Sequence, residues 1–249
     1  MNKEPIASED HRVRVGAHRR GKARLRLLQS ALVVFAEKGI DATVIDDVIA
    51  VAGVSRGTFY NHFKTTQELL LTLATAMSDE VLAVVDPLVL SFSDPVHRFS
   101  AGTRLYMQTA LRYPSWGRFI TNVGTRIAAR GQLIDLCLTR DLTSAIAAKL
   151  VIVTDLLVAR DIVLGSIFYG IETMLTEPTH EHHAEQLVET FLRGMGVAPK
   201  RANEIAFMHL PDVGAIPGPI FSTVPAPPKG GRRPRTPRTP TKRTAIRQP

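Results

Sequence analysis

The segment 39–70 constrains the fold more than any other part of this sequence. Apolar residues recur there at helical spacing and predict a short helix over about 44–51, with Thr43 as its N-cap. The apolar positions of this helix are Ile45, Val48, Ile49 and Ala52. Gly53 follows directly and permits a tight turn, so the chain is expected to reverse after a helix of about two turns.

A second short helix is expected after this turn. Ser55 is a suitable N-cap for a helix over about 55–61, and the two helices together form a helix-turn-helix pattern over about 44–63. In such a pair the second helix presents its N-terminal residues to the major groove of DNA. The groove is about 12 Å wide and admits one helix, so the pattern suits DNA binding.

The side chains of this second helix divide into two groups. Val54, Phe59 and Phe63 have no use on a polar surface and are expected to face the core. At the start of the helix Arg56 can reach guanine or a phosphate, and its neighbours are small or form hydrogen bonds; they are Ser55, Gly57 and Thr58. The residues left on or near the opposite surface, where they suit phosphate contacts, are Tyr60, Asn61, His62 and Lys64.

Two longer helices are expected on either side of this pair. The first spans about 22–38 and ends at Gly39, and one face of it is apolar through Leu25, Leu28, Leu32 and Phe35. The second opens with a capping box from Thr65 to Glu68 and is expected to stop before Pro87.

The sequence GIDATVIDDVIAVAGVSRGTFYNHFKTTQELL (39–70) resembles the DNA-binding domain of the tetracycline-repressor (TetR) family of bacterial regulators, and the likeness covers about residues 20–81. It implies an all-α homodimeric repressor that binds a near-palindromic DNA operator. The family's DNA contacts fall here on Thr43, Ser55, Arg56, Gly57, Thr58, Tyr60, His62 and Lys64.

The rest of the chain shows helical periodicity and no clean alternation, which favours an all-α fold. Further helices are expected over about 95–113, 115–129, 133–148, 155–176, 183–195 and 199–207. We divide the chain into a basic flexible arm (1–20), the DNA-binding domain (21–81), a helical ligand-binding and dimerisation domain (82–210) and a disordered Pro/Arg-rich tail (211–249).

The net charge of +8 is concentrated at the two chain ends. Residues 213–249 hold eight Lys and Arg and no acid, and residues 1–26 hold eight Lys and Arg against three acids. Basic ends indicate a polyanionic partner, with nucleic acid favoured over anionic lipid.

The resemblance also implies that the C-terminal unit binds a small apolar molecule and that the helices over 155–176 and 183–195 pair in a dimer. Candidate pocket residues, each of which also suits an ordinary core, are Tyr106, Met107, Trp116, Phe119 and Phe168. Candidate interface positions, again inseparable from core, are Ile162, Gly165, Ile167, Tyr169, Leu187, Val188, Phe191 and Met195.

Other kinds of site find little support. Cys137 is alone, which excludes an internal disulfide, and it suits a buried apolar position better than a redox sensor. The run from His180 to His183 lacks a pair at i, i+4, so no metal site is expected, and no catalytic motif is present. Charged residues expected on solvated helix faces are Arg104, Arg126, Arg130, Asp135, Asp141 and Asp161.

We therefore expect a sequence-specific regulator, a repressor released by a small apolar ligand, with no cofactor and no catalytic residue. No apolar run is long enough for a membrane helix and no secretory signal is present, so a cytoplasmic, nucleoid-associated location is expected. One alternative is a non-inducible architectural DNA-binding protein that relies on its basic termini. Another is an enzyme built on the C-terminal helices.

Overall fold

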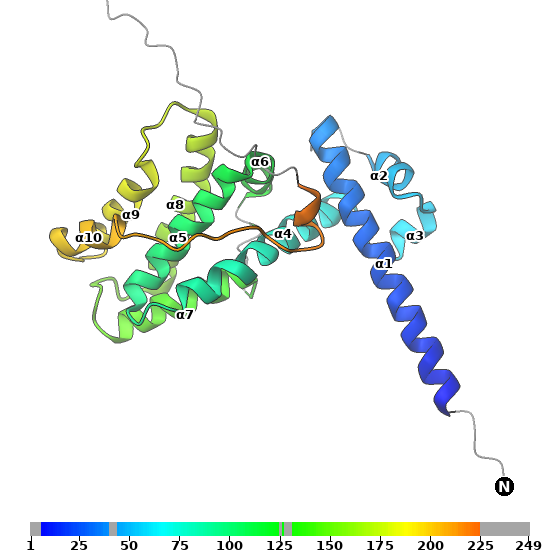
Figure 1. Cartoon of the computed structure of the whole chain (residues 1–249), viewed down its shortest axis with the longest axis horizontal. Coiled ribbons are helices and arrows are strands. Elements are labelled where there is room, and N and C mark those ends of the chain that lie inside the picture. Colours follow the sequence, from blue (N-terminus) through cyan, green and yellow to red (C-terminus); the bar gives the residue numbers. More distant parts are fainter. Residues whose placement is uncertain (1–5, 40–43, 125, 127–130, 225–249) are drawn as a thin grey trace, which may run out of the picture.

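The computed structural model describes residues 6–39, 44–124, 126 and 131–224. Within these ranges the chain forms helices and no strand, which confirms the predicted all-α fold. A small unit holding α2 and α3 lies at one end of the molecule and a larger bundle at the other (Figure 1). The helices are α1 (Ile6–Lys38), α2 (Ile45–Ala52), α3 (Arg56–Tyr60), α4 (Thr66–Val89), α5 (Pro95–Arg112), α6 (Pro114–Val123), α7 (Leu133–Ala147), α8 (Leu156–Thr176), α9 (His183–Gly194) and α10 (Pro199–Ala206), followed by a 3-10 turn at Phe221–Thr223.

α1 begins at Ile6, well before the predicted start near residue 22, and ends at the predicted Gly39, where φ is 80°. The prediction that residues 1–20 form a flexible arm is wrong from Ile6 onward. The physical reason is that Pro5 is the last strong helix breaker in this part of the sequence. The residues after it are mostly good helix formers, so the helix continues without a stop.

The first helix of the helix-turn-helix is capped differently from the prediction. α2 has Val44 as its N-cap residue, and the Val44 N–H donates to Asp47 Oδ2 at 3.5 Å. The predicted cap, Thr43, lies outside the described residues. Gly53 ends α2 with a left-handed φ of 60°, which confirms the predicted glycine turn.

α4 begins as predicted and ends later. The Thr65 hydroxyl accepts a hydrogen bond from the Glu68 N–H at 3.0 Å. The helix then continues through Pro87 to Val89, so the expected stop before Pro87 is wrong. Proline removes one hydrogen bond in the last turn, whereas the buried side chains of Val85 and Val89 keep that turn packed in the bundle.

α5 is the central helix of the C-terminal bundle. It packs against α4, α6, α7, α8, α9 and α10. Its start is fixed as predicted by Asp94, whose Oδ1 accepts from the Val96 N–H at 2.8 Å. α6 ends at Val123 rather than near residue 129; residues 125 and 127–130 lie outside the described part. The other helix ends differ from the predictions by only one or two residues.

After α10 the chain returns to the N-terminal unit as an extended segment, residues 208–224, which we call the strap (Figure 1). Its backbone is held near the middle and near the C-terminal end: Arg112 donates to the Gly214 carbonyl at 2.6 Å, and the Ile220 and Phe221 N–H groups donate to Glu80 at 3.0 and 2.6 Å. Gln29 of α1 donates to the Pro219 carbonyl at 2.9 Å.

The strap corrects the predicted start of the tail. The prediction of disorder from residue 211 is wrong as far as Val224, and residues 225–249 lie outside the described part. The reason is that apolar residues recur between the prolines of the strap and are buried, namely Ile216, Ile220, Phe221 and Val224. The Phe221 ring packs edge-on against Tyr113 and Trp116, with centroid separations of 4.8 and 5.4 Å.

Candidate nucleic-acid interface and internal cavity

α3 is fixed in position by the aromatic residues beneath it. Phe59 and Phe63 are buried and Val54 is half-buried, as predicted. Burial of such a side chain contributes about 1.5–3 kcal/mol, so these residues hold α3 firmly on the N-terminal unit. The polar residues of α3 therefore lie on its outer face.

The first turn of α3 is closed by two hydroxyls. Ser55 Oγ accepts from the Thr58 N–H at 3.1 Å, which confirms Ser55 as the N-cap. The same oxygen lies 2.9 Å from Thr58 Oγ1. An N-cap of this kind contributes about 1 kcal/mol to helix stability. Both hydroxyls thus have a structural role at the surface that we expect to meet DNA.

Arg56 is oriented by an acid that the sequence reasoning missed. Its Nη2 donates to the two oxygens of Asp46 on α2 at 2.5 and 2.6 Å. Both side chains are about 60% exposed, at 60% and 61%. The pair lies across the turn between the two short helices and holds the guanidinium beside the start of α3, where it is accessible to a partner.

Gly57 is exposed, and nothing inside the protein requires a glycine there. An added Cβ would meet only Ser55 Oγ, at an ordinary contact distance of 3.8 Å. Glycine is unfavourable in a helix by up to about 1 kcal/mol relative to alanine. A glycine that the fold does not need is consistent with close approach of a partner to this surface.

The C-terminal end of α3 presents the other predicted residues. Tyr60 is 51% exposed and leans edge-on against the Phe59 ring. Asn61 and Lys64 are exposed, whereas His62 is half-buried. The Lys64 N–H donates to Glu68 Oε2 at 2.7 Å, so the capping box fixes the backbone that carries this lysine. The structure thus brings eight of the nine predicted residues to one region; Thr43 lies outside the described residues.

The C-terminal bundle contains a small, partly open cavity of about 50 Å³. Most of its wall is apolar and comes from α4, α5, α7 and α8. Its lining consists of Leu82, Val85, Asp86, Val89, Arg98, Phe99, Gly102, Thr103, Tyr106, Ile134, Cys137, Leu138, Asp141 and Ile167. The polar members of this set lie on three different helices, so they converge only in the folded chain.

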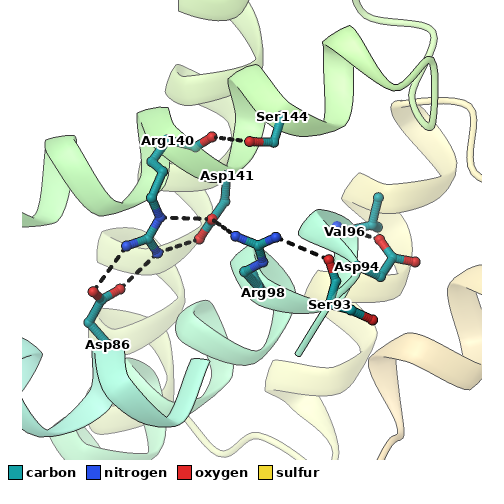
Figure 2. A network of polar contacts seen from close by, with 8 residues as sticks. All are labelled: Asp86, Ser93, Asp94, Val96, Arg98, Arg140, Asp141 and Ser144. Atoms are coloured by element: carbon teal, nitrogen blue, oxygen red, sulfur yellow. Dashed lines mark hydrogen bonds and ion pairs between the residues drawn. The ribbon is translucent and has the colours of Figure 1, made fainter. Parts of the chain in front are cut away.

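Two acids and two arginines form a network beside this cavity (Figure 2). Arg140 bridges Asp86, at 2.8 and 3.0 Å, and Asp141, at 2.9 and 3.0 Å. Arg98 approaches Asp141 at 3.4 Å and donates to the Ser93 carbonyl at 3.0 Å. The formal charges of the four side chains sum to zero. The network can therefore form hydrogen bonds with a molecule in the cavity without adding a net charge there.

The network sets the protonation of its neighbours. Hydrogen bonds from Arg140 hold the pKa of Asp86 below its usual range. Burial, together with the nearby Asp86 charge, raises the pKa of the Cys137 thiol to about 12. Burial also raises the pKa of Tyr106, whose hydroxyl lies 2.9 Å from Ser78 Oγ. At neutral pH the cavity therefore holds a carboxylate, a protonated thiol and a protonated phenol.

The predicted pocket residues meet this cavity in only one case. Tyr106 lines it, whereas Met107, Trp116 and Phe168 are buried elsewhere in the core. Phe119 instead stacks on Phe35 of α1, with centroids 5.8 Å apart, between the two units. The role of all five residues in ligand binding stays a prediction.

Several charges that were expected on solvated faces are buried. Asp135 and Asp141 are 6% and 2% exposed, and Asp135 is paired with Arg160 at 2.5 Å. Arg104 is 6% exposed and donates to Glu185 and to the Met208 carbonyl, both at 2.8 Å. For these three residues the prediction is wrong, because each finds a partner from a distant helix or from the strap.

α8 carries an apolar stripe on its outer face. Its exposed members, at steps of four and seven residues, are Val158, Ile162 and Tyr169, and Leu157 lies beside them. Gly165 lies within the stripe with open space where a Cβ would be. The other interface candidates, on α8, on α9 and at the C-cap of α9, are half-buried or buried in this chain, namely Ile167, Leu187, Val188, Phe191 and Met195.

The described part of the chain offers neither a membrane span nor a metal cluster. No helix there is long and apolar enough to cross a membrane. Nor do three or more His, Cys, Asp or Glu side chains gather there as a metal ion would require, and His180–His183 is no exception.

Two family models match the chain, and together they span both units. Residues 27–73 match the bacterial regulatory proteins of the TetR family, and residues 94–208 match the tetracyclin repressor-like C-terminal domain. The first match contains α2 and α3, and the second contains α5 to α10.

Curated relatives match through the N-terminal unit. The chain is 35% identical over 75 residues to the transposon Tn10 TetC protein of Escherichia coli, and 34% identical over 75 residues to the HTH-type transcriptional repressor KstR2 of Mycobacterium tuberculosis. Each match covers 30% of this chain, and 36% and 38% of the respective relative. The chain thus spans little more than a third of these relatives.

Solved structures match over most of the chain. RolR in complex with resorcinol superimposes with a TM-score of 0.68 at 27% identity, covering 80% of this chain and all of that one. A TetR-family regulator from Pectobacterium atrosepticum has a TM-score of 0.53 at 22% identity, covers 72% of this chain and 96% of that one, and shows the fold alone.

Proposed function

Because the chain belongs to the TetR family of bacterial transcriptional regulators, we propose that it is a homodimeric repressor that leaves its operator when a small ligand binds. The observation that carries the proposal is the outer face of α3. It gathers a hydrogen-bonding arginine, a glycine that the fold does not need and a phenol, namely Arg56, Gly57 and Tyr60, above a rigid aromatic base. A single helix with such a face suits the major groove.

The proposed contacts fall into two kinds. Arg56 is placed at the start of α3 to bind base edges, whereas Tyr60 and Lys64 at its other end suit phosphates. Asp46 holds Arg56 before DNA arrives. A pre-oriented guanidinium loses less side-chain entropy on binding than one that is unconstrained.

The stripe on α8 supports the homodimer. Exposed apolar residues in one line on a helix indicate a protein surface that another copy covers. Gly165 in the middle of the stripe allows two helices to approach closely. A dimer brings two α3 helices to one duplex, with half-sites about 34–36 Å apart or a multiple of that.

The cavity supports a ligand that is small, uncharged and able to form hydrogen bonds. Its apolar wall suits a ring, and the charge-balanced network suits hydroxyl groups better than a carboxylate or an amine. The relative RolR was solved with resorcinol, which is of this class.

Ligand entry must enlarge the cavity, and α4 connects that change to DNA. A cavity of about 50 Å³ is well below the roughly 150 Å³ that accepts benzene, so its walls must separate. Leu82, Val85 and Asp86 of α4 form one wall, and the other end of α4 begins two residues after Lys64. The ligand shifts the protein toward the non-binding arrangement by its differential affinity for the two states.

A selection of genomic fragments on the purified protein tests the proposal. It is run at about 150 mM salt beside a Tyr60→Phe, Lys64→Ala double variant, because weak binding to any DNA dominates at low salt. We expect a palindromic consensus for the native chain that the variant loses. Diffuse recovery that survives in the variant and disappears when residues 225–249 are deleted would instead favour an architectural DNA-binding protein.

A further inference from the structure

The N-terminal half of α1 is a charged helix that the two matched domains do not include. The N-terminal family match begins at residue 27, whereas α1 begins at Ile6. Between residues 11 and 36 the sequence holds seven Lys and Arg and no Asp or Glu. Figure 1 shows this half of α1 extending past α2 and α3, away from the C-terminal bundle.

The described side chains of this half of α1 lie near the surface. No side chain from Arg14 to Arg26 is buried, and Leu27 is the first of the described α1 side chains that is buried. Most helical stability in proteins comes from packing of an apolar face, and such a face is missing here. Like charges one turn apart, such as Arg20 and Arg24, destabilise the helix further.

Two contacts fix where this helix leaves the N-terminal unit. The Arg26 guanidinium donates to the Ala52 carbonyl, directly before the turn that leads into α3. The Arg24 guanidinium lies over the Phe63 ring, 5.6 Å from its centroid and next to Lys64 in sequence. The helix therefore leaves the unit beside both segments that flank α3.

The basic side chains continue from this point along one side of the helix. His18 and Lys22 precede Arg26 at steps of four residues, which places them on the same helix face, and Arg19 lies beside them. All of these side chains are exposed. The charged surface of α1 is thus continuous with the DNA-binding face of the helix-turn-helix.

We propose that the N-terminal half of α1 is a second DNA-binding element, which lies along the phosphate backbone that flanks the operator. The segment from Ile6 to Gly21 is about 24 Å long, the length of about seven base pairs. From residue 11 to residue 26 the basic side chains of this helix repel one another with no acid between them. A duplex supplies one negative charge per about 1.7 Å to offset that repulsion. Contacts of this kind add affinity and leave the operator sequence unchanged.

This inference rests on the proposed function, and its test separates the two. Fluorescence anisotropy compares the full-length native chain with an Arg19→Gln, Arg20→Gln, Lys22→Gln variant on duplexes that carry the selected operator, with or without about ten flanking base pairs on each side. The control variant removes the same charge from exposed sites on α6, α9 and α10: Arg118→Gln, Arg193→Gln, Lys200→Gln.

Each phosphate contact contributes about 0.9 to the slope of log affinity against log salt. Because each protomer of the proposed homodimer loses three such contacts, we expect the native dimer to lose about 1,800-fold more affinity than the triple variant does between about 50 and 200 mM salt, which is about 40-fold for each protomer. The native chain should also gain affinity from the flanking base pairs, and the triple variant should not. The control variant should behave as the native chain does, and all three proteins should select the same operator.

Three outcomes would overturn the inference. One is that the triple variant keeps the native salt slope and the native gain in affinity from flanking base pairs. Another is that the control variant loses as much DNA affinity as the triple variant does. Tighter binding of the native chain to phosphatidylserine vesicles than to a flanked duplex would assign the helix to a membrane surface. Failure of the native chain to select any operator would instead overturn the proposed function itself.

Discussion

Each of the two units of this protein contains an ion pair between an arginine and an aspartate, but the two pairs lie in opposite environments. On the helix-turn-helix, Arg56 and Asp46 form an ion pair at an exposed surface, open to an incoming partner. In the bundle, Arg140 and Asp141 form a pair in which the aspartate is only 3% exposed. The exposed pair orients a side chain for recognition, whereas the buried pair, whose two residues both lie on α7, belongs to the network that joins α4, α5 and α7 beside the cavity.

This difference matters because the cost of losing a partner depends on burial. An exposed ion pair contributes little to stability, because water replaces the lost partner. A charge left alone in the interior has no such replacement. Changes in the bundle should therefore be measured first as stability, and changes on α3 first as DNA affinity.

The largest expected effect follows from removing Asp141. Asp141→Ala leaves Arg98 without an acidic partner and Arg140 with Asp86 alone, so we expect a loss of about 3–5 kcal/mol in the free energy of unfolding, measured by urea titration. Asp161→Ala, on the exposed side of α8, is the matched control and should cost less than about 0.5 kcal/mol. Equal losses for the two variants would remove the contrast between buried and exposed acids.

The next effect concerns the strap. Phe221→Ala removes a buried ring from between Tyr113 and Trp116, and such truncations cost about 3 kcal/mol or more. Because Trp116 is the only tryptophan in the sequence, its fluorescence reports on this contact. We expect red-shifted emission as water reaches the indole. Phe207→Ala, at an exposed position, should leave the spectrum unchanged; an unchanged spectrum for Phe221→Ala would mean that the strap does not dock in solution.

A smaller effect is expected from pH. Asp86 has a lowered pKa in the folded chain, so it binds protons less readily there than in the unfolded chain. The ionised Asp86 contributes fully to the free energy of unfolding above the pKa of about 4 that an aspartate has in the unfolded chain. This contribution is lost as the pH falls through the lower pKa that Asp86 has in the folded chain. Thermal melts from about pH 6 downward should therefore decline less steeply for Asp86→Asn than for the native chain. Parallel curves would show that Arg140 does not stabilise the Asp86 charge.

The variant with the smallest expected change in stability should be more stable than the native chain but bind the operator more weakly. Gly57→Ala removes a helix-weakening glycine at an unstrained position, so we expect a gain of about 0.5–1 kcal/mol in stability. The new methyl group lies on the face proposed to enter the groove, so operator affinity should fall in anisotropy titrations. Retained affinity in a stabilised variant would remove Gly57 from the interface.

The sequence predicted the N-terminal unit well because its signals are local. Caps at Ser55 and Thr65 and the turn at Gly53 each depend on residues within a few positions, and all three occur in the structure. Local signals failed at α1 and at Pro87. There, the length of a helix is decided by the absence of a stop and by packing against distant residues.

The cavity could not be predicted because its parts are distant in the sequence. Asp86, Arg98 and Asp141 lie on three helices, and nothing near any of them marks it as buried. The strap was not predicted for a related reason: its proline-rich composition suggested disorder, but Phe221 is held by Glu80 of α4 and packs on Trp116 of α6, both more than 100 residues away in the sequence. Asp46 was missed because its partner on α3 is ten residues away, across the turn.

The most direct test of the account is a selection from randomised duplexes by the native chain and by two single variants, Arg56→Ala and Lys64→Ala. Loss of a contact to a base should change the selected sequence, whereas loss of a contact to a phosphate should weaken binding to every sequence. We predict that Arg56→Ala relaxes the preference at one symmetric pair of positions, while Lys64→Ala keeps the native consensus and binds every sequence more weakly. An unaltered consensus for Arg56→Ala, with equal weakening by both variants, would contradict the claim that α3 recognises the operator sequence.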